Sequence, residues 1–542
     1  MSKAWHQHYP VGCNTEISEQ LPTSMAAMFR SAVDKYSDQD AYQSFGQSLT
    51  YSDIDRLSEQ FAAYLQQKTG VKKGDRVAVM CPNSFGFAIS MWGIIRAGGV
   101  QVSVNPLYLP HELENQLNDA QVETIIIFSA STQVLAEVVE NTPIKNIIVV
   151  NLDDLIGKGL PNTPVDPRIT QFTEFTEALE AGKKLHFKAP DLCLDDLIFL
   201  QYTGGTTGLS KGAMLSHGNL VSNIHQYREI AGDRIDYGKE VVITAIPMYH
   251  IFALCANTLC YFSFGSVNVL ITNPRDMPSF VETWKHTNAT FFTGVNTLFN
   301  GLVHTPGFDQ IDFSSLKLSI GGGAPVQQAV SDKWKAITGK GIKEGYGLSE
   351  TSPVLSLNLT ADADYVNGIG IPIPSTDISI RDEEGHAVAQ GESGELCAKG
   401  PQIMQGYWQN EAATAESMTE DGYFKTGDIA MLDDQGFFHI VDRKKDMILV
   451  SGFNVFPTEI EAEVAKMEGV LESACIGVED EKSGGSPQTL VVKKDPDLSV
   501  EQVIAFCKTK MTAYKVPRHV VFIDEIPKST VGKLLRRELR NY

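Results

Sequence analysis

Several features that would assign the chain to a familiar class of protein are missing. No two of its eight cysteines have the Cys-x-x-Cys spacing, so we expect buried, reduced thiols and neither disulfides nor a zinc site. Residues 1–12 contain no apolar run, so no signal peptide is expected. Internal repeats and low-complexity tracts are also absent, which excludes a repeat architecture.

Positive charge is scarce as well. The 542 residues include 45 Lys and Arg against 66 Asp and Glu, a net charge of −21. Because nucleic acids and anionic membranes carry the same sign of charge, a general nucleic-acid binder is excluded. The 43% of hydrophobic and 20% of charged residues are typical of a soluble globular protein with a large core. An anionic ligand would need local cations and backbone N–H donors.

One stretch has almost no charge. Between Glu240 and Arg275 only His250 can carry one, and the stretch is long enough to cross a bilayer. Pro247, Gly265 and several Asn and Ser residues interrupt it, which favours a strand, a helix, a turn and a strand inside a core. A transmembrane span is the alternative, and peripheral membrane contact stays open.

The first two thirds of the chain alternate between helix and strand patterns. Apolar residues recur at helical spacing after Ser52 or Asp53, either of which can cap a helix, and Gly70 suits its end. A second, apolar helix is predicted over residues 85–97. Strands are predicted over residues 76–80, 124–128, 146–150, 197–200, 290–292 and 316–320. This order predicts an α/β fold with a largely parallel sheet.

The pattern changes near residue 360. Short strands over residues 378–381, 394–399 and 436–441, separated by turn residues, indicate a β section. An α+β unit follows, with a helix over 459–467, strands over 474–478 and 489–493, and a helix over 500–511. We place a boundary in the charged run 442–445, a sequence that is also typical of a solvated turn. The predicted domains are a large N-terminal one, 1–442, and a small mobile one, 443–542.

The segment 202–212 carries the strongest chemical signal. After Tyr202 it contains Thr203, Gly204, Gly205, Thr206, Thr207, Gly208 and Lys211. Glycines let backbone N–H groups approach an anion, threonine hydroxyls donate, and lysine adds a cation. It is not a Walker A loop, because Lys211 is followed by Gly212 and not by Ser or Thr. These residues predict a polyphosphate clamp, and a glycine-rich turn without a ligand is the alternative.

Six further motifs accompany this loop. They occupy residues 247–250, 321–325, 345–351, 426–428, 442–446 and 527–533. In content and order they resemble the adenylate-forming superfamily, which includes acyl-CoA synthetases, luciferases and the adenylation domains of peptide synthetases. Residues 421–461 are similar to the fatty acyl-CoA synthetase signature, and bacterial long-chain fatty acid–CoA ligases give the nearest resemblance.

This resemblance implies an ATP site in the N-terminal domain. The adenine would lie on Gly345, Tyr346 and Gly347, with Gly323 close to the nucleotide and the Ser349 hydroxyl at the α-phosphate. Thr206 and Glu350 would bind magnesium, which takes few protein oxygens besides those of phosphate. Outside the family, Tyr346 would be a packing residue and Glu350 a charge at a helix start.

Residues late in the chain are implied to complete the site. Asp428 would accept the ribose hydroxyls, and Arg443 would reach the ribose or a phosphate. Lys445 would be the hinge about which the C-terminal domain turns, with its charged neighbours in solvent, and Gly452 would let the pantetheine arm of CoA pass. Lys533 would bridge the substrate carboxylate and the α-phosphate, which offsets the repulsion between two anions. Outside the family it would be one of several surface cations.

An acyl pocket is implied around His250, which would help to place the carboxylate. A lone histidine in an apolar run is also typical of a core. Five apolar residues would wall the acyl tunnel or simply form core: Ile251, Phe252, Val295, Leu298 and Phe299.

The implied reaction joins a fatty acid to ATP as acyl-AMP and then to CoA, with Lys533, Glu350 and His250 as catalytic residues. No covalent nucleophile is needed, which agrees with the lack of an evident catalytic triad. A homodimer, a cytoplasmic location and loose attachment to the inner face of a membrane are also implied. One alternative is an adenylating enzyme that passes its acyl group to the thiol of a carrier protein, or an amino-acid adenylation domain. Another is a silent nucleotide sensor, which we expect to lack Lys533, Glu350 or Asp428.

Two positions depart from the family pattern. Leu449 stands where some relatives have a second active-site lysine. Residues 483–488 lack the Gly-Glu pair that precedes the next strand in the nearest relatives, so we expect an effect on C-terminal packing or on CoA contacts.

Overall fold

The computed structural model describes residues 3–18, 20–203, 210–359, 368–451, 453–480, 483–529, 532 and 534–542. The chain folds as two compact units. Unit 1 comprises Met1–Val366, Pro372–Thr376 and Gly400–Glu416, and unit 2 comprises Asn367–Ile371, Asp377–Lys399 and Ser417–Tyr542. The predicted domain boundary between residues 442 and 443 stays a prediction.

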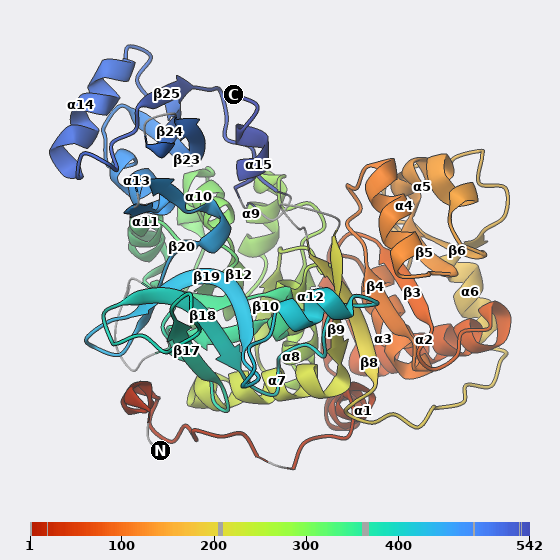
Figure 1. The fold of residues 1–542 in the computed structure, drawn as a ribbon. Helices are drawn as coiled ribbons and strands as arrows, with labels where there is room; N and C mark the ends of the chain where they lie inside the picture. Colours follow the sequence, from red (N-terminus) through yellow and green to blue (C-terminus); the bar gives the residue numbers. More distant parts are fainter. Residues whose placement is uncertain are drawn as a thin grey trace. The chain divides into compact units, whose positions relative to one another are not determined.

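The first sheet of unit 1 has the strand order β7-β6-β5-β3-β4-β8-β9. Its strands are β3 (Arg76–Met80), β4 (Val100–Ser103), β5 (Thr124–Phe128), β6 (Asn146–Val150), β7 (Thr173–Glu174), β8 (Leu197–Thr203) and β9 (Lys211–Ser216). All neighbours are parallel except β8 and β9, which form an antiparallel hairpin. Helices α4 (Pro110–Asp119) and α5 (Thr132–Val138) cover one face, and α6 (Phe175–Gly182) lies below the sheet in Figure 1.

The strands of the second sheet that lie wholly in unit 1 have the order β15-β14-β13-β12-β10-β11-β1-β2. Its strands are β1 (Asp40–Ser44), β2 (Gln47–Thr50), β10 (Val241–Thr244), β11 (Val267–Leu270), β12 (Phe291–Gly294), β13 (Leu318–Gly321), β14 (Ile342–Gly347) and β15 (Val354–Leu357). Strands β11, β10, β12, β13 and β14 are parallel to one another, whereas β15 is antiparallel to β14. Helix α7 (His217–Ala231) precedes β10, and α9 (Met277–Lys285), α10 (Asn296–His304) and α11 (Gln328–Thr338) follow strands of this sheet. Helix α12 (Glu411–Glu416) comes late in the chain. The predicted α/β fold class is confirmed.

The stretch with little charge lies within this second sheet and its helices. It forms β10, a π-helix (Phe252–Leu259), α8 (Cys260–Ser263) and β11, as predicted. Among the described residues, no helix is both long and apolar enough to span a membrane.

Helix α3 (Phe85–Ala97) connects the two sheets of unit 1. All of its residues are buried, because it packs on the first sheet and also contacts the second. The indole N–H of Trp92 donates to the hydroxyl of Tyr42 in β1 at 3.1 Å, and its ring lies 4.7 Å from that of Phe262 in α8. The predicted bounds of this helix are confirmed.

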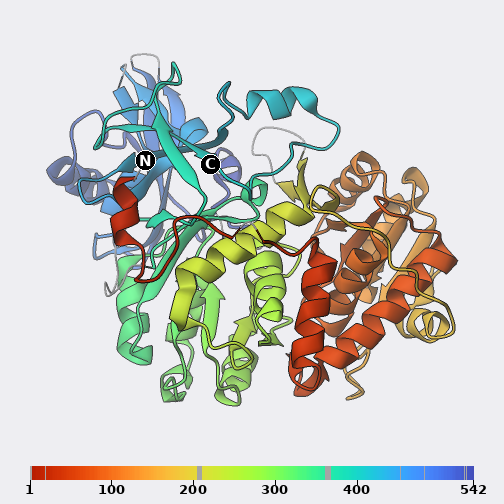
Figure 2. The same cartoon turned by 90° about the horizontal axis from the view of Figure 1, so that it is seen from below.

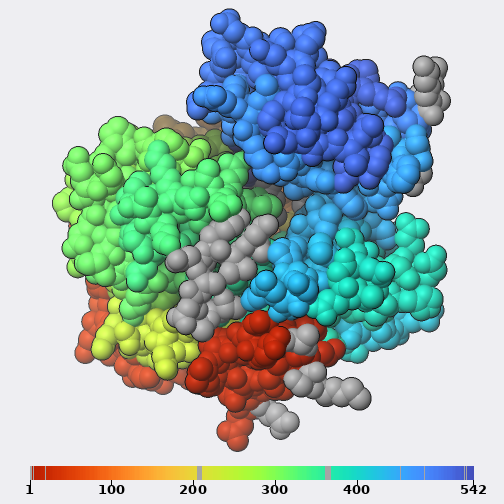
Figure 3. Space-filling view, turned by 90° about the vertical axis from the view of Figure 1, so that its left-hand side faces the viewer, coloured from red at the N-terminus to blue at the C-terminus, as the bar shows by residue number. Residues whose placement is uncertain are grey.

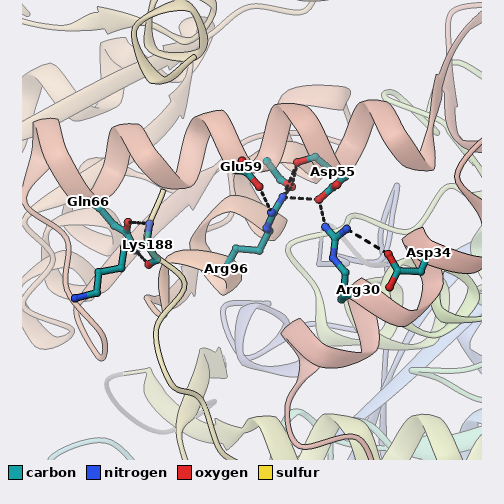
Figure 4. A network of polar contacts seen from close by, with 8 residues as sticks. Arg30, Asp34, Asp55, Glu59, Gln66, Arg96 and Lys188 are labelled. Atoms are coloured by element: carbon teal, nitrogen blue, oxygen red, sulfur yellow. Dashed lines mark hydrogen bonds and ion pairs between the residues drawn. The ribbon is translucent and has the colours of Figure 1, made fainter. Parts of the chain in front are cut away.

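A polar network holds the other end of α3. Arg96 forms ion pairs with Asp55 at 3.0 Å and Glu59 at 2.8 Å, both in α2 (Tyr51–Tyr64), as Figure 4 shows. Arg30 of α1 (Met25–Tyr36) also pairs with Asp55 and with Asp34. The network therefore joins the three helices α1, α2 and α3.

The start of α2 differs from the prediction. The cap is Thr50, whose hydroxyl accepts the N–H of Asp53 at 3.1 Å, while the Asp53 carboxylate accepts the N–H of Thr50 at 3.2 Å. Ser52 and Asp53 are therefore inside the helix, because this reciprocal capping box uses Asp53 as its third residue. The predicted end is confirmed, since Gly70 has a φ of 78° after the π-turn Leu65–Thr69.

The N-terminal segment runs along α7 (Figure 2) and forms part of the surface (Figure 3). The side-chain amide of Asn14 donates to Glu229 of α7 at 3.1 Å, and the hydroxyl of Tyr9 donates to the carbonyl of Pro372 at 2.9 Å. The bond from Tyr9, together with the bond from the N–H of Ser375 to the carbonyl of Thr15 at 2.9 Å, attaches residues 372–376 to the N-terminal segment.

Unit 2 contains two sheets. The antiparallel sheet β17-β18-β19-β20 is the predicted β section, with strands β17 (Asp377–Arg381), β18 (Ser393–Lys399), β19 (Phe424–Leu432) and β20 (Phe438–Arg443). The other has the order β22-β21-β24-β23, with β25 (His519–Phe522) beside β24. Its further elements are β21 (Ile448–Val450), β22 (Phe453–Val455), α13 (Pro457–Val464), β23 (Val470–Asp480), β24 (Gly484–Lys493), α14 (Val500–Lys510) and α15 (Arg536–Leu539). Its core includes Ile460, Val491 and Val503.

The cysteines agree in part with the prediction. All eight are free thiols. Six are buried, whereas Cys13 is half-buried and Cys193 is exposed.

Candidate active site

Three of the sequence motifs meet at one edge of the second sheet. Residues 247–250 follow β10, residues 321–325 begin at the end of β13, and residues 345–347 end β14. These strands are parallel, so their carboxyl ends share an edge, where α/β sheets usually bind ligands. A Cβ added at Gly322 would lie 3.0 Å from the ring of Phe252 and 3.4 Å from the carbonyl oxygen of Gly345. Residues 321–325 are therefore in van der Waals reach of residues 345–347 and of Phe252, which follows the residue 247–250 motif.

The glycines around Tyr346 have a structural reason to be there. A Cβ at Gly347 would lie 1.8 Å from the carbonyl oxygen of Pro353, and one at Gly345 would lie 2.7 Å from Leu357. The close pairing of β14 with β15 therefore excludes larger residues, whether or not adenine is bound. Tyr346 is half-buried between them, and Gly323 is exposed with a φ of 77°. The nucleotide roles of these residues stay predictions.

The predicted phosphate loop joins β8 to β9. Thr203 pairs with Lys211 across the hairpin, and the hydroxyl of Ser210 donates to the carbonyl of Thr203 at 2.6 Å. The two ends of the loop are therefore fixed side by side. The loop residues Gly204, Gly205, Thr206, Thr207 and Gly208 lie outside the described residues, so their contacts with phosphate stay predictions.

Tyr202 anchors the hairpin at its base. Its hydroxyl donates to the carboxylate of Asp119 in α4, and its ring is 3.0 Å from the position that a Cβ at Gly212 would take. Burial, and then the Asp119 carboxylate, raise the pKa of Tyr202 well above its usual value, so it stays a hydrogen-bond donor. Tyr202 and Gly212 are therefore packing partners across the hairpin.

Glu350 lies beside this hairpin in the 3-10 turn Ser349–Thr351, which contacts both β8 and β9. The N–H of Leu348 donates to the hydroxyl of Thr351 at 2.9 Å and so fixes the turn. The Glu350 carboxylate is only 7% exposed and accepts the hydroxyl of Tyr407 at 2.9 Å. No Lys or Arg in the described part of the chain forms an ion pair with it.

The surroundings of Glu350 fit a magnesium ion. A buried carboxylate whose hydrogen-bond partner is neutral is a suitable ligand for a cation, because no other positive group is paired with it. No group of three or more His, Cys, Asp and Glu that could hold a metal occurs among the described residues. Magnesium suits such a place, since it takes one or two carboxylates and fills its other positions with phosphate and water. Thr206, the other predicted ligand, lies outside the described residues.

His250 is held in a well-defined turn. The amide of Gln201, in β8, donates to the carbonyl of Tyr249 at 2.9 Å, and the N–H of Phe252 donates to Nδ1 of His250 at 3.3 Å. Asn83, after β3, accepts the N–H of Met248 at 2.7 Å. The turn is therefore fixed to the first sheet by Gln201 and Asn83, two residues that the sequence analysis missed, because a lone buried amide gives no spacing signal.

The five candidate residues of the acyl tunnel separate into two groups. Val295, Leu298 and Phe299 belong to one hydrophobic core cluster, and Ile251 is also buried. The ring of Phe299 is fully buried and lies 4.8 Å from that of Trp334, so the core alternative holds for it. Phe252 is half-buried and contacts the residue 321–325 motif, which leaves it the best placed to face a ligand.

In unit 2 the structure brings Asp428 and Arg443 together. They are paired in register across β19 and β20, and Nε of Arg443 lies 2.8 Å from the carboxylate of Asp428. Asp428 is buried, whereas the side chain of Arg443 is 43% exposed. Lys445 follows in the turn Lys444–Asp446 and is exposed; partial desolvation and then Arg443 lower its pKa.

The expectation that the neighbours of Lys445 are all in solvent is wrong for Asp442. Its side chain is 3% exposed and accepts the N–H of Thr458 at 2.8 Å, in the first turn of α13. A carboxylate there satisfies a free N–H and faces the positive end of the helix dipole. Burial nevertheless raises the pKa of Asp442. The run 442–445 therefore includes a buried helix cap.

Lys533 and Gly452 lie outside the described residues, and their roles stay predictions. Close to Lys533, Lys528 and Leu534 form an antiparallel bridge. Lys528 also pairs with Glu472 at 2.6 Å, and Arg536 pairs with Glu461 at 2.7 Å. Ion pairs therefore hold the chain on both sides of Lys533.

The two departures from the family pattern lie next to each other. Leu449, in β21, is 57% exposed. Residues 484–488 form the start of β24, and Gly484 pairs with both Asp480 and Val450. A Cβ at Gly485 would lie 2.9 Å from the carbonyl oxygen of Leu449. The changed segment therefore takes part in the packing of β21 against β24.

The chain belongs to the AMP-binding enzyme family. The family model described as AMP-binding enzyme matches residues 29–408, and the one described as AMP-binding enzyme C-terminal domain matches residues 459–533. A long-chain-fatty-acid–CoA ligase of Escherichia coli O6:H1 is 47% identical, over 100% of this chain and 98% of the relative. A ligase of the same name from Bacillus subtilis is 34% identical, over 99% and 97%.

Solved structures agree with this assignment. ATP-bound MatB from Rhodopseudomonas palustris has a TM-score of 0.83 at 28% identity, covering 95% of this chain and 98% of its own. The resemblance drawn from the sequence motifs is confirmed.

Proposed function

We propose that the protein is an ATP-dependent ligase that activates a long-chain fatty acid as acyl-AMP and transfers the acyl group to CoA. The observation that carries this proposal is the 47% identity with a long-chain-fatty-acid–CoA ligase along the whole chain. It includes the residues late in the chain, where Asp428 and Arg443 are paired.

In the first step, a carboxylate oxygen of the fatty acid forms a bond to the α-phosphorus of ATP. The bond from that phosphorus to the bridging oxygen breaks, and pyrophosphate leaves. In the second step, the sulfur of CoA attacks the acyl carbon of the mixed anhydride, the thiol proton is lost, and AMP leaves. No enzyme nucleophile takes part, so the task of the protein is to bind and orient polyanions.

The residues divide this task between them. The β8–β9 hairpin, with Lys211 at its end, would hold the leaving pyrophosphate, and Asp428 would hold the ribose. A magnesium ion bound by Glu350 and Thr206 would supply positive charge at the phosphates. Lys533 would bring the carboxylate to the α-phosphate in the first step only.

The test is to measure pyrophosphate release and thioester formation across saturated fatty acids from short to long chain. We expect both to require the fatty acid and ATP, and the thioester to require CoA. If turnover occurred only with a carrier protein, that protein and not CoA would be the acceptor. Pyrophosphate release that is independent of any fatty acid would overturn the proposal. Lys533→Ala should abolish acyl-AMP formation and spare thioester formation from supplied acyl-AMP.

We also propose a homodimer, a cytoplasmic location and peripheral contact with the inner face of a membrane. The molar mass in solution and the distribution between soluble and membrane fractions test these points.

A further inference from the structure

We propose that Tyr407 is a positioning residue that sets both Glu350 and Lys211 for binding the magnesium complex of ATP. The proposal deepens the function proposed above and rests on it for the identity of the ligand. Tyr407 belongs to none of the motifs that indicated the site.

The two ends of the Tyr407 side chain contact two different parts of the site. Its hydroxyl donates to the carboxylate of Glu350 at 2.9 Å. The ammonium of Lys211 lies 5.1 Å from the centre of its ring, within the range of a cation–π interaction. A single side chain therefore orients a candidate metal ligand by its hydroxyl and a candidate phosphate ligand by its ring.

The backbone around Tyr407 is fixed to the same hairpin. The N–H of Gln405 donates to the carbonyl of Met214 at 2.9 Å, and that of Trp408 donates to the carbonyl of Gly212 at 2.8 Å. Tyr407 also forms a bridge with Ala213. Residues 405–408 thus extend the hairpin as a further strand-like segment, which places Tyr407 independently of any ligand.

The charge at this cluster is suited to a cation. The neutral Tyr407 satisfies one oxygen of Glu350 without neutralising it. A lysine or arginine in its place would instead compete with a metal ion for the carboxylate.

Unit 2 offers a matched control, because Tyr423 has the same combination of partners. Its hydroxyl donates to Asp377 at 2.9 Å, and Arg381 lies 4.4 Å from the centre of its ring. None of these three residues belongs to the predicted site.

The experiment measures the affinity of the full-length protein for a non-hydrolysable ATP analogue by calorimetry, with and without magnesium. Tyr407→Phe removes only the hydroxyl. We expect about tenfold weaker binding in the presence of magnesium, because one hydrogen bond to a charged group is lost. Binding in the absence of magnesium should be unchanged. Tyr407→Leu also removes the ring, so binding should weaken under both conditions. Tyr423→Phe should match the wild type under both.

Two results would overturn the proposal. One is a Tyr407→Phe variant that binds as the wild type does at every magnesium concentration. The other is a variant that loses affinity equally with and without magnesium while its melting temperature falls, which indicates a structural role. Since these measurements contain no fatty acid, they stand even if the wild type fails to activate one.

Discussion

In unit 1, the carboxylates of Glu350 and Glu344 near the carboxyl edge of the second sheet accept hydrogen bonds from neutral donors. In unit 2, the buried Asp428 and the half-buried Glu461 are paired with guanidinium groups. Glu350 accepts the Tyr407 hydroxyl, and Glu344 accepts the backbone N–H of Val326. The opposite end of the same sheet behaves like unit 2, since Glu240, before β10, is paired with Lys317 at 2.6 Å.

Within unit 1, the difference follows the position of the predicted magnesium site. A carboxylate paired with a cation has its charge compensated and attracts a metal ion less. An unpaired one can bind a cation, as we propose for Glu350, or can take up a proton. Glu344 is of the second kind, because burial raises its pKa to about 8.

The largest expected effect is on stability, at the pair between Arg536 and Glu461. Arg536→Ala leaves the Glu461 carboxylate, whose side chain is 17% exposed, without its cation and should lower the free energy of unfolding by up to about 3–5 kcal/mol, measured by urea denaturation. Lys515→Ala is the control, since it removes a more exposed partner of Glu459 in the same helix and should have a much smaller effect. Equal effects from both would show that burial of the pair does not matter.

Removal of the Glu350 charge should affect activity and not stability. Glu350→Gln should slow acyl-AMP formation by about 10²–10³-fold, the range found for a group that stabilises developing charge. The melting temperature should not fall, because an amide oxygen still accepts the Tyr407 hydroxyl. Asp377→Asn, at the matched Tyr423, should leave the rate unchanged; a fall in melting temperature for Glu350→Gln would assign Glu350 a structural role.

The proton on Glu344 should make stability depend on pH. Its pKa is raised from 4.5 to about 8 in the folded protein, so the folded state binds more protons than the unfolded state between these values. The wild type should therefore lose up to about 1.4 kcal/mol of stability per pH unit between pH 5 and 8, relative to Glu344→Gln. Parallel unfolding curves of the two proteins across this range would contradict the assignment.

The smallest effect concerns the helix cap in unit 2. Asp442→Ala removes the acceptor for the Thr458 N–H and should cost about 1 kcal/mol in urea denaturation. Asp442→Asn keeps an acceptor and should recover most of the loss. A change in thioester formation without a change in stability would link Asp442 to the predicted hinge at Lys445 instead.

Sequence patterns predicted those elements whose cause is local. The bounds of α3, β3, β5 and β6 match the prediction, because each is a run of apolar residues whose period and flanking turns are visible in the sequence. The predicted cap of α2 was wrong for a local reason too. Thr50, Ser52 and Asp53 are all residue types that cap helices well, and only the folded structure shows that Thr50 is the cap.

The interactions within the site depend on distant residues. Tyr407 and Glu350 are 57 positions apart, and Gln201 and Tyr249 are 48 positions apart. Hydrophobic period and turn chemistry contain no information on such pairs. The motifs identified which loops carry the chemistry, whereas the residues that hold these loops in place were visible only in the folded chain.

The route of the chain between the units has a consequence for its synthesis. Gly400–Glu416, with Tyr407, belongs to unit 1, whereas its neighbours Asp377–Lys399 and Ser417–Tyr542 belong to unit 2. On the ribosome, unit 1 therefore remains unfinished until residue 416 has emerged, by which time the first strands of unit 2 are already outside. The two units cannot mature strictly one after the other, as separate domains do. For the same reason, no single cut in the chain separates one intact unit from the other.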